Sequence, residues 1–195
     1  MSSAEMGAPG VRPADVEGWF TGLGLTPTER ADRDGITSWD LVLDGRRRFD
    51  LRITVILDPA LALICWAHYA PPIGDMFRKS YRRLLRWNDE FPFAKFSVAE
   101  DERPLLAVEI PIEETDADAL GLAIARILGI ADRLLDESKD WLWLGGRMPD
   151  MGDRTSANAE FLDRYAARLP ELLEPEATDE PGEPAQPVRP LGPGA

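Results

Sequence analysis

The spacing of apolar residues predicts one short helix followed by strands. Residues 1–12 are small and lack an apolar pattern, so we expect them to be disordered. After Pro13, which suits a first helical turn, apolar side chains recur at helical spacing: Val16, Trp19, Phe20 and Leu23. Gly24 suits the helix end. Beyond it the apolar spacing changes to two, which is typical of β-strands.

Three apolar stretches then predict three antiparallel strands: "ITSWDLVL", "FDLRITVIL" and "LALICWAHY". Asp44-Gly45 joins the first two and predicts a type I′ hairpin turn, because both residue types tolerate positive φ. Asp58-Pro59 predicts the next corner. The third stretch is apolar at nearly every position, as expected of a strand covered on both faces.

Residues 76–89 predict a second helix, in which polar and apolar residues separate. Its expected inner face consists of Phe77, Tyr81, Leu84, Leu85 and Asn88. Its outer face is basic and consists of Arg78, Lys79, Arg82, Arg83 and Arg86.

Two more strands and two helices complete the pattern. "FPFAKFSVAE" and "RPLLAVEIPIE" are expected to pair through the turn "EDER". Thr115 and Asp118 resemble a capping box before a long helix. The core stripe of that helix is Leu120, Ile124, Ile127, Leu128, Ala131, Leu134 and Leu135. Leu122 and Ile130 lie off the stripe, which indicates a second covered face.

The long helix runs into "WLWLGG", where Gly145 suits a helix end. A loop and an amphipathic helix that Pro170 kinks are expected over 145–173. The apolar side of this helix is Phe161, Leu162, Tyr165, Leu169 and Leu172. Residues 174–195 are rich in Pro, Gly and Glu and are expected to be a disordered acidic tail. We therefore place one domain at 13–144, followed by an appended helix and this tail.

Composition limits the classes of function. The chain has 195 residues, 44% of them hydrophobic and 29% charged, which fits one globular domain. Its formal net charge of −13 disfavours nucleic acid and anionic membranes as partners. No stretch has the length and apolarity of a membrane span or the pattern of a leader peptide. One cysteine among apolar neighbours fits a reducing compartment, and we expect a cytoplasmic location.

The residues that could carry chemistry favour a protein that is not an enzyme. Cys65 and the only histidine, His68, are three apart in a predicted strand and should point to opposite faces. Cysteine and histidine are too few for a usual zinc site, and no phosphate-binding loop is present. The carboxylates of "IEETDAD" suit helix capping better than acid and base catalysis. We expect no cofactor, although an oxygen-ligand Mg²⁺ or Ca²⁺ site stays open.

The basic helix allows two interpretations. Its five cations can form a solvated face that pairs with carboxylates elsewhere in the chain. Alternatively, Arg78, Arg82 and Arg86 form a row, spaced four residues apart, that engages an acidic partner segment. Elsewhere in the chain, Trp141 and Trp143 are candidates for an exposed apolar edge and for contact with a partner.

The segment from Leu84 to Leu134 resembles the YbjN family, whose fold is that of type III secretion chaperones, and the resemblance extends over roughly residues 13–140. The resemblance rests on an apolar pattern and a few turn residues, namely Asn88, Pro92, Phe93 and Phe96. It implies an α+β domain of order α-β-β-β-α-β-β-α with an antiparallel sheet, to which this chain adds a C-terminal helix. It also implies a structural turn at Asn88, a homodimer, and a regulatory role without a catalytic set.

The expected function is therefore that of a chaperone-like or regulatory module that holds a partner polypeptide on its sheet or helix surface. The final helix could occupy the partner groove in cis. Two alternatives stay open. One is an enzyme with an oxygen-ligand metal or a carboxylate pair, and the other is a nucleic-acid regulator that uses the basic helix at 78–86.

Overall fold

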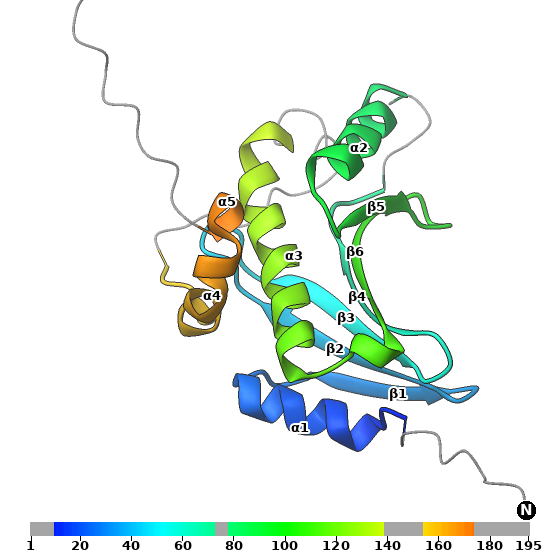
Figure 1. Ribbon diagram of the computed structural model, residues 1–195. Helices are drawn as coiled ribbons and strands as arrows, with labels where there is room; N and C mark the ends of the chain where they lie inside the picture. Colours follow the sequence, from blue (N-terminus) through cyan, green and yellow to red (C-terminus); the bar gives the residue numbers. More distant parts are fainter. Residues whose placement is uncertain (1–9, 73–77, 139–153, 174–195) are drawn as a thin grey trace, which may run out of the picture.

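A six-stranded antiparallel sheet forms the centre of the computed structural model, which describes residues 10–72, 78–138 and 154–173 (Figure 1). The strand order is β1-β2-β3-β4-β6-β5. The strands are β1 (Glu29–Arg33), β2 (Ile36–Leu43), β3 (Leu51–Asp58), β4 (Ala62–His68), β5 (Lys95–Val98) and β6 (Pro104–Pro111). The α-helices are α1 (Pro13–Leu23), α2 (Arg78–Glu90), α3 (Ala117–Ser138), α4 (Ala159–Tyr165) and α5 (Pro170–Leu173), with short 3-10 helices at Ile112–Glu114 and Ala166–Arg168.

The predicted α+β class and element order are confirmed, and the structure adds one strand, β1. All five residues of β1 are exposed, and the strand pairs only with β2 at the edge of the sheet. An apolar pattern could not have indicated it. The turn from β1 to β2 is Asp34-Gly35, and both residues have positive φ, 53° and 82°. Asp34 and Gly35 thus form the type I′ hairpin turn of the sheet edge.

The prediction of a type I′ turn at Asp44-Gly45 is wrong. Neither residue has positive φ, and a loop over residues 44–50 joins β2 to β3. Gly45 is needed for a different reason. A Cβ at this position would lie 2.3 Å from Oδ1 of Asp132, so only glycine lets the loop approach that carboxylate.

The core lies between the sheet and α3, which packs against β4 and β6 (Figure 1). Every residue of the predicted core stripe on α3 is buried. Ile130, which lies off this stripe, is also buried, because α4 and α5 cover a second side of α3. The helix begins after Asp116, whose Oδ1 accepts the Ala119 N–H at 2.7 Å. Asp116 rather than Thr115 is therefore the cap.

The predicted C-terminal helix is broken into α4, a 3-10 turn and α5, and Pro170 begins α5. The kink at this proline is confirmed. The apolar residues predicted for its inner side are all buried in the same cluster as the sheet and α3. Tyr165 packs over Gly121, and Leu172 and Leu173 pack over Gly129. The two helices are thus part of the main core.

Among the described residues, the inner face of α2 differs from the prediction at Leu85 and Trp87; Phe77 lies outside them. Leu84 and Trp87 are buried, whereas Leu85 is 67% exposed. The buried side is centred between Leu84 and Trp87 and continues into Phe91, so Leu85 falls at its margin. Trp87 meets Tyr69 and Phe96 in edge or tilted ring contacts that hold α2 to the sheet.

Candidate functional site

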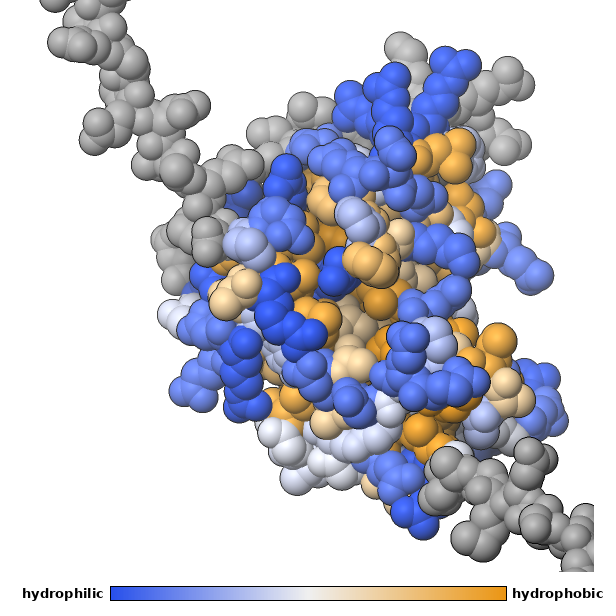
Figure 2. All heavy atoms as spheres, viewed as in Figure 1, coloured by the Kyte–Doolittle hydropathy of each residue, from blue (hydrophilic) through white to orange (hydrophobic). Residues whose placement is uncertain are grey.

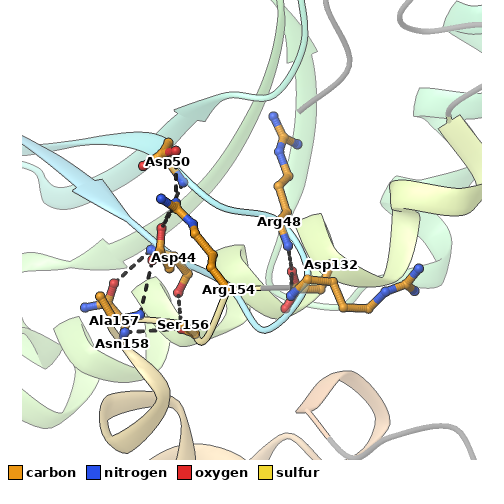
Figure 3. A network of polar contacts seen from close by, with 9 residues as sticks. Asp44, Arg48, Asp50, Asp132, Arg154, Ser156, Ala157 and Asn158 are labelled. Atoms are coloured by element: carbon orange, nitrogen blue, oxygen red, sulfur yellow. Dashed lines mark hydrogen bonds and ion pairs between the residues drawn. The ribbon is translucent and has the colours of Figure 1, made fainter. Parts of the chain in front are cut away.

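The loop between β2 and β3 concentrates buried charge, and its backbone surrounds one carboxylate (Figure 3). Oδ2 of Asp132 accepts the N–H of Arg46 at 2.6 Å, and Oδ1 accepts those of Arg47 and Arg48 at 3.0 and 2.7 Å. Asp132 is only 5% exposed. Burial raises the pKa of its carboxyl, and the three N–H groups oppose this shift. Asp132 thus ties α3 to the loop.

A second carboxylate in the loop, Asp44, holds the segment that leads into α4 (Figure 3). Its oxygens accept the side chain of Arg154 at 3.0 Å and the backbone N–H of Ala157 at 3.1 Å. Its own N–H donates to Asn158 at 2.8 Å. Arg154 also pairs with Asp50 at 2.9 Å and lies over the ring of Phe49. These charges serve internal contacts, so the loop has a structural role.

The residues weighed for catalysis lie apart. Cys65 is fully buried, and burial raises the pKa of its thiol to about 12. His68 lies on the other face of β4 and is half-buried. In "IEETDAD", Asp116 caps α3 and Asp118 pairs with Arg168 at 2.5 Å. Within residues 10–72, 78–138 and 154–173, no group of three or more His, Cys, Asp or Glu is arranged to hold a metal ion.

The basic face of α2 points to solvent at Arg82 and Arg86, which make no ion pair with any residue that the structure describes. Arg83 points toward α3 and donates to the carbonyl of Glu137. Leu85 lies beside Arg82 on the helix surface and is mostly exposed. Arg78 begins α2, but its side chain lies outside the described part, as do Trp141 and Trp143.

Asn88 closes part of the sheet edge. Its side chain donates to the carbonyl of Phe96 at 3.1 Å and accepts the N–H of the same residue. A neighbouring strand would make the same two bonds to this position of β5. The Asn88 amide therefore takes the place of a strand at the outer edge, and it fixes the turn between α2 and β5.

A shallow cavity of about 210 Å³ lies where the end of α2 meets α3 and α5. Its lining is Glu90, Phe91, Pro92, Arg126, Ile130, Arg133, Glu171 and Leu172. Arg126 donates to the Pro92 carbonyl at 2.9 Å, and Arg133 donates to the Glu171 carbonyl at 2.7 Å. Neither guanidinium is paired with a carboxylate of the described chain. The cavity thus combines an apolar floor with two available cations.

An unusual aromatic residue, Phe93, follows Pro92 of the cavity lining. Phe93 is 81% exposed and has φ of 63°, a left-handed conformation that is unfavourable for a large side chain. The guanidinium of Arg126 lies 5.1 Å from the centre of its ring. Burial lowers the pKa of Arg126, which means that its charge has lost part of its hydration. Figure 2 shows apolar surface in the middle of this face, framed by hydrophilic side chains that are dense at α2.

Sequence reasoning identified the row on α2 but missed Arg126 and Arg133. The available signal was Ile130, an apolar residue off the core stripe with an arginine on each side at spacings of four and three. Cations beside a covered apolar position indicate the margin of a packing surface. Which segments meet there could not be read from the pattern, because the lining comes from three distant parts of the chain.

Comparison with known proteins identifies the family to which the chain belongs. A search of curated proteins found no match. None of the helices in the described part has the length and apolarity needed to cross a membrane. The model of the YbjN family, whose description reads "Putative bacterial sensory transduction regulator", matches residues 12–140. This match spans more than half of the chain and includes the sheet, α2 and α3. The chain belongs to the YbjN family.

Proposed function

We propose that this protein is a non-enzymatic regulator that binds a partner polypeptide through the outer face of α2. The observation that carries the proposal is the group of Arg82, Leu85 and Arg86. It combines two exposed cations, which lack ion pairs within the described chain, with a leucine that is 67% exposed. Arginine beside an exposed apolar side chain is a common composition for a protein interface.

Both edges of the sheet are less suited to a partner strand. The edge strand β1 exposes charged side chains along its length, a feature that discourages pairing with another strand. On β5, the side chain of Asn88 occupies the backbone groups of Phe96. These features favour binding to the helical face over strand addition.

A polypeptide is a better partner than nucleic acid for this face. Asp89 and Glu90 follow Arg86 within one helical turn, and both are exposed. Two carboxylates at the end of the row would repel a continuous phosphate backbone. An acidic and apolar segment of limited length can contact Arg82, Leu85 and Arg86 without approaching these two carboxylates.

The proposal also includes a cytoplasmic location and a homodimer. The sheet face opposite α3 supports the homodimer, because Val42 is 44% exposed there and the cross-strand pair Ile56 and Ile64 is only half-buried. Analytical ultracentrifugation of the full chain and of a Val42→Glu variant tests this part. A monomer at all accessible concentrations of the parent chain would contradict it.

Charge reversal tests binding through α2. The double variant Arg82→Glu and Arg86→Glu should bind a specific protein from a bacterial lysate about a hundredfold or more less tightly than the parent chain does. The expected loss reflects charge-assisted hydrogen bonds, which contribute about 1.5–3 kcal/mol each. Quantitative mass spectrometry of the retained proteins measures it.

The matched control makes the same change in net charge elsewhere. Arg33→Glu and Arg52→Glu alter the hairpin of β1 and β2 and the sheet face opposite α3, where both arginines are exposed. This control should retain the same protein as the parent chain does. Equal loss in both double variants would mean that overall charge, and not α2, determines binding.

A further inference from the structure

The cavity between α2, α3 and α5 holds two cations in fixed positions. Arg126 and Arg133 are seven residues apart on α3, which places them two turns, or roughly 10 Å, apart along the helix axis. Each uses a terminal nitrogen to donate to a backbone carbonyl, Pro92 for Arg126 and Glu171 for Arg133. Each also lies over an aromatic ring, that of Phe93 or Phe91. The guanidinium groups are therefore preorganised, with further N–H donors left for a ligand.

The surface between the two arginines is apolar. Ile130 is fully buried, and Phe91 and Leu172 are at most 8% exposed while still lining the cavity. Glu90 and Glu171 also line it, yet neither comes within ion-pair range of the two guanidinium groups. Arg126 is partly desolvated, and Glu171 acts on it only from beyond ion-pair distance, so an anion that enters the cavity would offset the cost of its burial.

The volume limits what can bind. A cavity of about 210 Å³ is below the range of roughly 300–1,000 Å³ typical of sites for drug-sized ligands. It suits one or two amino-acid side chains better than a nucleotide. The exposed Phe93, held in a left-handed backbone conformation beside Arg126, offers a ring against which such a side chain can pack.

We infer that this cavity binds a carboxylate side chain and the apolar side chain next to it in an acidic segment of the partner polypeptide. The carboxylate accepts hydrogen bonds from Arg126. The positive charge of Arg133, at the other end of the cavity, adds to the attraction for the carboxylate. The apolar side chain rests on Phe91 and Leu172, whose remaining exposed surface lines the cavity above the buried Ile130. This inference rests on the proposed function, because it specifies the sequence that the partner presents. The cavity lies one helical turn beyond Arg86.

A titration with a defined probe tests the inference. The probe is N-acetyl-leucyl-glutamic acid amide, added to the full chain labelled with ¹⁵N. The side-chain N–H signals of Arg126 and Arg133, assigned with Arg126→Lys and Arg133→Lys, should shift and saturate. The glutamine analogue should bind about tenfold or more weakly, because it replaces the charged acceptor with a neutral one. Arg126→Ala should abolish the shift, and Arg52→Ala on the sheet face should leave it unchanged.

A variant of the C-terminal tail distinguishes a carboxylate of a partner from the carboxylates of this chain's own tail. Residues 174–195 follow α5 and contain Glu174, Glu176, Asp179, Glu180 and Glu183. A full chain with these five replaced by Gln or Asn is titrated in the same way. Tighter probe binding by this chain would show that its own carboxylates compete for the arginines, which supports the site. Absence of a shift in both chains, or equal binding of the glutamate and glutamine probes, would overturn the inference.

The outcome of the probe titration can be distinguished from the outcome of the test of binding through α2. The variant Arg82→Glu with Arg86→Glu should still bind the dipeptide probe, because neither residue lines the cavity. Loss of lysate binding without loss of probe binding would support both proposals. Probe binding without any specific protein retained by the parent chain would leave the cavity site standing and remove the proposed function.

Discussion

Replacing Asp132 with alanine should lower the free energy of unfolding by about 3 kcal/mol or more. The substitution leaves three N–H groups of the loop, at residues 46–48, without their acceptor next to a buried helix. Such a loss is large against the 5–15 kcal/mol that stabilises an ordinary domain. Chemical denaturation of the variant and the parent chain measures it.

A surface carboxylate on a neighbouring helix serves as the control for Asp132. Asp163 pairs with Arg46 at 2.8 Å, but its side chain is 67% exposed. Asp163→Ala should therefore cost only about 0–1 kcal/mol. Similar costs for the two alanine variants would show that the carboxylate of Asp132 does not hold the loop.

Asp132 should also make stability depend on pH. Burial raises the pKa of this carboxyl above the unfolded value of about 3.9. The unfolded chain then releases its proton at lower pH than the folded chain does, so the contribution of Asp132 to stability falls as pH rises between these two pKa values. The advantage of the parent chain over Asp132→Asn should shrink across this interval and stay constant above it. An advantage that grows with pH would contradict the direction of the shift.

Adding a methyl group at Gly121 should destabilise the protein by about 2 kcal/mol, although alanine is normally the better helix former. A Cβ at this position would lie 1.9 Å from the hydroxyl oxygen of Tyr165 and 2.5 Å from its ring carbon Cζ. The matched control is Gly18→Ala in α1, where the Cβ would meet nothing within 4 Å. That variant should gain roughly 0.5–1 kcal/mol.

The contrast between the two glycines tests whether the C-terminal helices are integral to the domain. In a double-mutant cycle, Tyr165→Ala should remove most of the penalty that Gly121→Ala adds. Thermal and chemical unfolding of the four proteins give the coupling free energy. If Gly121→Ala stabilised the chain as Gly18→Ala does, α4 would not pack on α3 as observed.

Much of the fold could be predicted because its apolar periodicity is local. The stripes of β2, β3, β6 and α3 are continuous along the sequence, and burial follows them closely. Strand β1 escaped detection because its stability comes from pairing with β2, and it buries none of its side chains. The sequence predicts an inward Leu85, because an apolar residue at the margin of a helical face looks the same in sequence as one at its centre.

The candidate sites were harder to predict because their contacts are distant in sequence. The loop residues Arg46–Arg48 meet Asp132 across more than 80 positions, and no spacing rule connects them. The cavity likewise joins Phe91, Arg126 and Leu172. By contrast, the exposed row at Arg82 and Arg86 lies on one helix, and periodicity was sufficient to place it on the outer face.

Site-specific photocrosslinking tests the central claim, that a partner polypeptide binds to α2. A photoreactive amino acid is placed in the full chain at position 85 on α2 or at position 42 on the opposite sheet face, both occupied by exposed apolar residues. After irradiation in bacteria, position 85 should give a discrete crosslinked protein that Arg82→Glu with Arg86→Glu removes, and position 42 should give at most a second copy of this chain. A partner protein crosslinked from position 42 and none from position 85 would contradict the account.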